Sequence, residues 1–102
     1  MSQLAIEIYY DVARIPGIED RSDFSLEALA FRNAAMDHVE AAMMAEGAGE
    51  WEGAEIGSGE VNFGFAVESF EKAERVVRKA VAGTPYDCIR EIARIDYSEY
   101  AD

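Results

Sequence analysis

The sequence has a single cysteine and no long apolar run, and its first residues show no leader pattern. The single cysteine, Cys88, cannot form an intramolecular disulfide, and a lone cysteine is most often a small apolar residue of the interior. No apolar run approaches the roughly 18 residues of a membrane-spanning helix. The first eleven residues, MSQLAIEIYYD, hold neither a basic segment nor a cleavable apolar one. We therefore expect a cytoplasmic protein with no membrane partner.

Positive charge is also scarce, since nine Lys and Arg residues stand against 21 Asp and Glu residues, a net charge of -12. No basic residue lies between Arg32 and Lys72, whereas residues 72–94 form a mildly basic segment. Nucleic acids and anionic lipids select for clustered Lys and Arg. We therefore expect no direct contact with nucleic acid. We also expect the acidic and basic side chains to lie on separate parts of the molecule.

Residues of the usual catalytic and metal-binding types are single or lack the required spacing. His38 is the only histidine and falls at the edge of a helical apolar face, which favours a boundary position over a general base. One histidine and one cysteine are too few for a zinc site, and the acidic residues lack the spacing of a calcium loop. We expect no catalytic residue, no cofactor, no metal and no enzymatic activity.

The glycine-rich stretch EIGSGEVNFGF could be a phosphate-binding loop or a hairpin turn. A phosphate loop needs a third glycine where Asn62 stands, and it needs a helix next, but a strand pattern follows. A two-residue turn at Ser58-Gly59 brings apolar residues opposite one another. The predicted pairs are Ile56 with Val61, Glu55 with Asn62, Ala54 with Phe63 and Gly53 with Gly64. We therefore predict a hairpin turn.

The remaining periodicities predict one α+β domain over residues 1–102. Alternation predicts strands at 4–11 and 88–97, on either side of the hairpin and two helices. The helices fall within 24–47 and 69–85, with Ser25 and Ser69 as N-caps and glycines after the last turns. Residues 98–102 are expected to fray.

The order strand, helix, strand, strand, helix, strand resembles the ferredoxin-like α/β plait at the level of the fold. The resemblance implies a four-stranded antiparallel sheet of order 4-1-3-2 with both helices on one face. The other face would then be open. We predict the following residues on it: Ala5, Glu7, Tyr9, Trp51, Gly53, Asn62, Gly64, Ala66, Arg90, Ile92 and Arg94. An ion pair from Glu7 to Arg90 or Arg94 is expected there.

This fold hosts many functions, so the function must be argued from residues. Our first hypothesis is a small acidic module that binds a basic protein surface, with the acidic run from 37 to 71 steering the encounter. The predicted contact residues are Glu7, Tyr9, Glu50, Trp51, Glu52 and Glu55. In size and charge the chain is similar to small bacterial or phage inhibitors, such as immunity proteins of nuclease toxins and anti-CRISPR proteins.

The second hypothesis is a small-ligand protein or enzyme of unknown substrate that forms a homodimer through the open sheet face. Its pocket would lie between the sheet, the loop 12–24 and the facing subunit. Arg14, or Arg90 with Arg94, would anchor an anionic ligand. A self-complementary interface would favour this hypothesis, and a monomer with an exposed face would favour the first.

Overall fold

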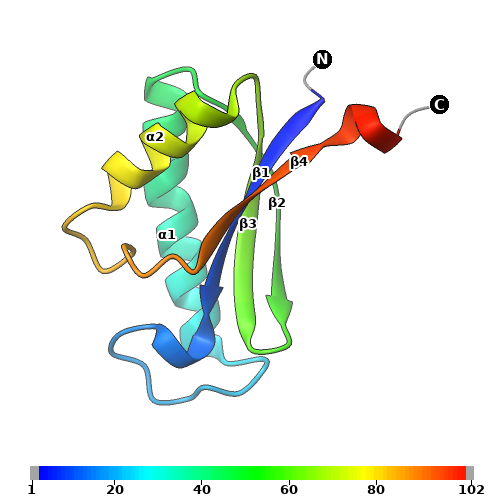
Figure 1. Cartoon of the computed structure of the whole chain (residues 1–102). Coiled ribbons are helices and arrows are strands. Elements are labelled where there is room, and N and C mark those ends of the chain that lie inside the picture. Colours follow the sequence, from blue (N-terminus) through cyan, green and yellow to red (C-terminus); the bar gives the residue numbers. More distant parts are fainter. Residues whose placement is uncertain (1–2, 101–102) are drawn as a thin grey trace.

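Two helices pack against one face of a four-stranded antiparallel sheet in the computed structural model, which describes residues 3–100 (Figure 1). The elements are β1 (Leu4–Asp11), η1 (Val12–Arg14), α1 (Leu26–Ala45), β2 (Glu50–Gly57), β3 (Glu60–Val67), α2 (Phe70–Val81), β4 (Glu91–Asp96) and η2 (Tyr97–Tyr100). The strand order β2-β3-β1-β4 is the predicted order 4-1-3-2 counted from the opposite edge. The α+β class and the sheet order are therefore confirmed.

Both helices begin at the predicted caps. The Ser25 hydroxyl accepts a hydrogen bond from the Ala28 N–H at 3.1 Å, and Ser69 accepts one from the Lys72 N–H at 3.2 Å. Each bond satisfies a backbone donor that the first turn leaves without a helical partner. At the end of α1, Gly47 has a φ of 60° and the Ala48 N–H donates to the Met43 carbonyl. This left-handed glycine turn ends the helix.

The core lies between the helices and the sheet. On β1 the alternate residues Ile6, Ile8 and Tyr10 are fully buried, and they meet apolar side chains of β3, α1 and α2. The Tyr10 hydroxyl donates to the Tyr86 carbonyl at 2.8 Å, and burial raises the pKa of this phenol. Strand alternation thus sends one set of side chains into the core and the next set to the far side of the sheet.

The predicted hairpin is confirmed. Ser58 and Gly59 form its two-residue loop with φ values of 54° and 77°, the positive pair that a type I′ turn requires. The predicted pairs also occur, namely Ile56 with Val61, Glu55 with Asn62, Ala54 with Phe63 and Gly53 with Gly64. A strand and not a helix follows the glycines, so the phosphate-loop interpretation is wrong.

The predicted position of Trp51 is wrong because β2 contains a bulge. Gly53 pairs with Gly64, but Trp51 pairs with Phe65, so one extra residue, Glu52, lies between them. One extra residue moves the preceding side chain to the other face of the sheet. Trp51 therefore lies at the β2 edge on the helix side, where its Nε1–H donates to the Met36 sulfur at 2.9 Å. The indole remains 48% exposed.

The predicted face is wrong for Ile92 and Arg94 of β4, whereas Arg90 lies against Tyr9, on the side of the sheet away from the helices, as predicted. Glu7 pairs with Ala93, so the neighbouring Ile92 and Arg94 point toward the helices. Ile92 packs against the core, and Arg94 donates to Glu74 of α2 at 2.7 Å. The expected ion pair from Glu7 to Arg94 is thereby ruled out, and Arg90 pairs with Asp11, Glu60 and Glu91 in place of Glu7. The pairing of β1 with β4 that motivated the prediction is confirmed.

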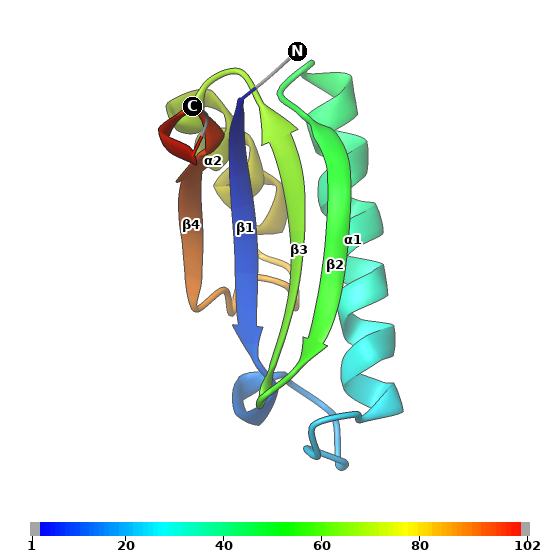
Figure 2. The same cartoon turned by 90° about the vertical axis from the view of Figure 1, so that its right-hand side faces the viewer.

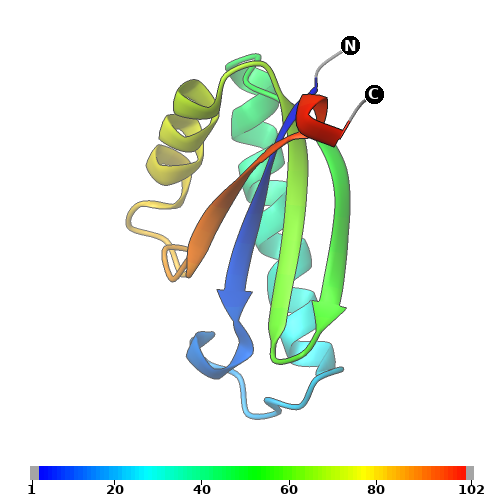
Figure 3. The same ribbon diagram turned by 45° about the vertical axis from the view of Figure 1, so that its right-hand side comes forward.

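The two ends of the described chain lie together (Figure 3). The Tyr97 N–H donates to the Gln3 carbonyl at 2.7 Å, which ties η2 to the start of β1. The predicted fraying of 98–102 stays a prediction, since residues 97–100 form η2 and residues 101–102 lie outside the described part. Within residues 3–100, no helix has the length and apolar character needed to cross a membrane.

Candidate partner-binding face

We call the side of the sheet that carries no helix the open face (Figure 2). Its residues follow from strand alternation and from the registers of the three strand pairs. Its acidic residues are Glu7, Asp11, Glu50, Glu52, Glu55, Glu60 and Glu91. They come from all four strands, so segments far apart in the sequence form one acidic surface.

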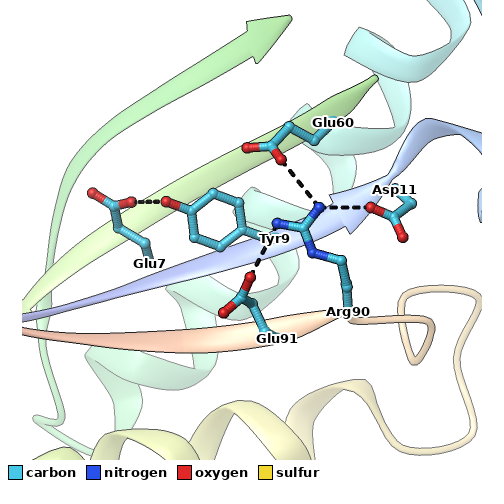
Figure 4. Close-up of polar contacts among 6 residues, drawn as sticks. All are labelled: Glu7, Tyr9, Asp11, Glu60, Arg90 and Glu91. Carbon is cyan, nitrogen blue, oxygen red and sulfur yellow. Dashed lines mark hydrogen bonds and ion pairs between the residues drawn. The ribbon is translucent and has the colours of Figure 1, made fainter. Parts of the chain in front are cut away.

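Arg90 lies at one end of the open face and is bound on several sides (Figure 4). Its Nη1 lies 2.7 Å from Asp11 and 3.0 Å from Glu60, and its Nη2 lies 3.1 Å from Glu91. These hydrogen bonds, that to Asp11 first, raise the pKa of Arg90 above its usual value. Because carboxylates already surround this cation, the open face keeps an excess of negative charge.

Tyr9 lies between the Arg90 network and Glu7. The guanidinium carbon of Arg90 is 5.1 Å from the centre of the Tyr9 ring, a cation–π distance. The Tyr9 hydroxyl donates to the Glu7 carboxylate (Figure 4). This hydrogen bond, together with burial and nearby carboxylates, raises the pKa of Tyr9 to about 12. Tyr9 is therefore a neutral, oriented ring at physiological pH and cannot serve as a base.

A shallow hollow of about 290 Å³ lies over the Gly53–Gly64 pair in the middle of the open face. Carboxylates of Glu7, Glu52 and Glu55 line it. The hollow exists because neither glycine has a side chain. A Cβ on Gly64 would meet the Ile6 carbonyl oxygen at 3.0 Å, whereas one on Gly53 would meet no atom within 4 Å.

Of the six predicted contact residues, the structure brings together Glu7, Tyr9, Glu52 and Glu55. Glu50 lies farther along β2, opposite Ala66. Trp51 lies at the β2 edge on the helix side of the sheet, so it contacts a partner bound to the open face only if that partner also covers the edge. The acidic run from 37 to 71 is divided, because Asp37 lies on α1 and the hairpin acids lie on the sheet.

The predicted contacts left out several residues of this face, among them Asp11, Glu60, Glu91 and Tyr97. Asp11 and Glu60 form a direct pair of the β1–β3 ladder. The hairpin register combined with the expected sheet order would have placed them together. The Tyr97 hydroxyl donates to Glu52 at 3.2 Å. No sequence pattern predicts this contact, because Tyr97 follows β4 at one edge of the sheet and Glu52 lies in β2 at the other edge.

The single histidine and the single cysteine each contact a backbone carbonyl, His38 that of Ala80 and Cys88 that of Pro85. His38 Nε2 lies 2.7 Å from the Ala80 carbonyl near the end of α2. Such an oxygen lacks a helical donor, so the nitrogen donates to it. Burial raises the pKa of the Cys88 thiol, which makes the thiolate scarce. Within residues 3–100, no group of three or more His, Cys, Asp or Glu side chains is arranged to hold a metal.

Of the arginines of the dimer hypothesis, Arg14 and Arg90 line one hollow of about 660 Å³ together with Asp11, Cys88 and Ile89. Arg94 is bound to Glu74 on the helix side, and Arg90 is enclosed by its carboxylates. No protein-family model, curated protein or solved structure matches the chain.

Proposed function

We propose that this protein binds a basic surface of another protein through its open face and the adjoining edge strand β2. The observation that carries the proposal is the charge of the open face. Carboxylates from four strands gather there, while the basic residue among them, Arg90, is already occupied. A surface of one sign steers an oppositely charged partner and can raise association rates by roughly 10- to 1,000-fold.

The edge strand supports the same proposal. Glu50, Glu52 and Glu55 are exposed along β2, and the bulge at Glu52 interrupts its regular backbone. Charges and bulges on an edge strand hinder pairing with a second copy of the same chain. A basic partner meets no such barrier. These features disfavour a homodimer formed by edge-to-edge pairing of β2. The face-to-face homodimer of the second hypothesis is disfavoured by a different feature, because it would bring two acidic open faces together.

The proposal includes inhibition as the consequence of binding. A partner with a cationic cleft, such as a nuclease or another protein that holds nucleic acid, would be blocked when an acidic face covers that cleft. This is the mode expected of immunity or anti-CRISPR proteins. We also propose that the fold is a ferredoxin-like plait, on the basis of its element order and strand order. The fold itself carries no argument about function.

The test uses the tagged full chain as bait in an extract of its native host. We expect one or more proteins with a basic surface to be retained. Association should slow as salt rises from roughly 50 mM to 500 mM, where the Debye length is about 4 Å. The triple variant E50K/E52K/E55K should lower the association rate about a hundredfold. Trp51→Ala should raise the dissociation rate if the partner covers the β2 edge.

A matched control carries the same change of charge elsewhere. Glu19, Asp37 and Asp87 are exposed and lie outside the open face, so E19K/D37K/D87K should bind far better than the open-face triple. An equal fall in association rate for the two triple variants would mean that only net charge matters, and it would overturn the assignment of the binding site to the open face. A turnover activity abolished by one or two substitutions, with no partner retained, would place the protein among enzymes.

A further inference from the structure

We infer that the groove between α1 and α2 binds a small amphiphilic anion, with an apolar body and one acidic head group. Residues of α1 and α2 line the groove, and these helices lie on the other side of the sheet from the open face (Figure 1). The groove volume of about 480 Å³ falls in the range of small-molecule sites. This inference does not rest on the proposed function, because the two sites share no residue.

The floor of the groove is apolar and made of small side chains. Ala42 and Ala45 contribute from α1, and Val76 and Ala80 contribute from α2. Ala42, Val76 and Ala80 are each partly exposed rather than buried in the core. Small residues on both helices leave room above the floor. An apolar ligand body placed there would remove this surface from water.

One wall of the groove is a row of cations. Lys72, Arg75 and Lys79 lie at spacings of three and four along α2, so they share one side of the helix. None of them forms an ion pair with another residue in the range 3–100. The cations of the sheet differ, because Arg90 and Arg94 are each bound by carboxylates. An anion in the groove would therefore meet free positive charge.

The position of Lys72 strengthens the case. Lys72 lies in the first turn of α2, where the helix dipole favours acidic residues and disfavours cations by a few tenths of a kcal/mol or more. Arg78 and Lys79 occupy the last turn, where the dipole favours them. A cation at the unfavourable end, turned toward a groove, is explained by an anionic ligand.

The remaining wall residue indicates how the ligand is oriented. Glu46, at the end of α1, lines the groove across from the cationic row. It would repel an acidic head group placed against α1. The head group therefore belongs beside α2, with the apolar body over the alanines. A carboxylate, a sulfonate or a phosphate ester on a short alkyl or aromatic body fits this arrangement.

The test uses the full chain with 8-anilinonaphthalene-1-sulfonate, whose fluorescence rises in apolar sites, and with decanoate as a competitor. We expect saturable binding to one site and displacement by decanoate. The double variant R75Q/K79Q should weaken binding by about tenfold, the effect of losing roughly 1.4 kcal/mol. The matched double R14Q/R78Q removes two exposed cations outside the groove and should change affinity less than about twofold.

A filling variant separates shape from charge. Ala45→Leu keeps every cation and adds bulk to the floor, so it should weaken binding by roughly fivefold, or about 1 kcal/mol. Backbone amide spectra of each variant establish that the fold is retained. They also locate the probe, whose shifts should concentrate in α1 and α2. Absence of saturable binding, equal losses in the two doubles, or shifts centred on the open face would overturn the inference.

Discussion

The open face and the α1–α2 groove differ in how their charged side chains are held. On the open face, the cation Arg90 is enclosed by Asp11, Glu60 and Glu91, and the surplus carboxylates face outward. In the groove, the cations of α2 have no such partners and line an apolar floor. Strand alternation and helical periodicity therefore sort one acidic chain into two surfaces of opposite character.

Net charge is therefore a poor guide to the charge of a single surface. The chain carries -12, yet one side of its helix layer offers anions a row of cations. The acidic run from 37 to 71, continuous in sequence, is divided between α1 and the sheet. The charge of each face, and not the total charge of the chain, indicates which partners that face can bind.

The largest predicted effect is a loss of stability on substitution of Gly64, which lies on the open face. In Gly64→Ala the new Cβ would lie 3.0 Å from the Ile6 carbonyl oxygen, against backbone that cannot move freely. We expect a loss of about 1 to 3 kcal/mol in the free energy of unfolding. Gly53→Ala, where the Cβ would meet no atom within 4 Å, should change stability by less than about 0.5 kcal/mol.

Urea unfolding of the two glycine variants measures this difference. In conditions where Gly64→Ala remains folded, its groove should bind the anilinonaphthalene probe as the unmodified chain does, because the distortion lies on the sheet. Equal stability of the two variants would mean that the open face is not closely packed at Gly64.

A smaller contrast is expected between Arg90 and Arg94. Arg90→Gln leaves Asp11, Glu60 and Glu91 without their shared cation, whereas Arg94→Gln leaves only Glu74. The urea midpoint should therefore fall further for Arg90→Gln. In about 1 M salt, where the Debye length is about 3 Å, the gap between the variants should narrow. A larger fall in the urea midpoint for Arg94→Gln than for Arg90→Gln would contradict a stabilising role of the Arg90 network.

The smallest effect concerns Tyr9 and pH. Its pKa is raised to about 12, above the usual value of about 10 in an unfolded chain. The folded state thus holds a proton that the unfolded state releases, and stability falls as pH rises from about 10 to about 12. The difference in ultraviolet titration between the unmodified chain and Tyr9→Phe should report this value. A phenol that titrates near 10 would exclude the hydrogen bond to Glu7.

Features fixed by local chemistry could be predicted from the sequence. Ser25 and Ser69 cap their helices because a hydroxyl at that position satisfies a free N–H. The turn at Ser58-Gly59 sets the register of the hairpin, and apolar matching confirms it. These effects act over a few residues, so one chain suffices to find them.

Features fixed by packing could not be predicted. The bulge at Glu52 turns Trp51 toward α1, where Met36 accepts its N–H. Nothing in the sequence around Trp51 marks the extra residue. On β4 the alternation was identified, but the side that faces the helices depends on the pairing of Ala93 with Glu7. Both errors moved a whole side chain to the opposite face, because strand periodicity is two.

Photo-crosslinking from single positions in the native host tests whether the open face holds the partner. A photoreactive phenylalanine derivative replaces Asn62, in the middle of the open face, or Asp37, on the exposed side of α1. We predict an adduct with a basic protein from position 62, lost when E50K/E52K/E55K is combined with it, and little or no adduct from position 37. The same adduct at equal yield from both positions, or none from position 62, would contradict the claim that the open face holds the partner.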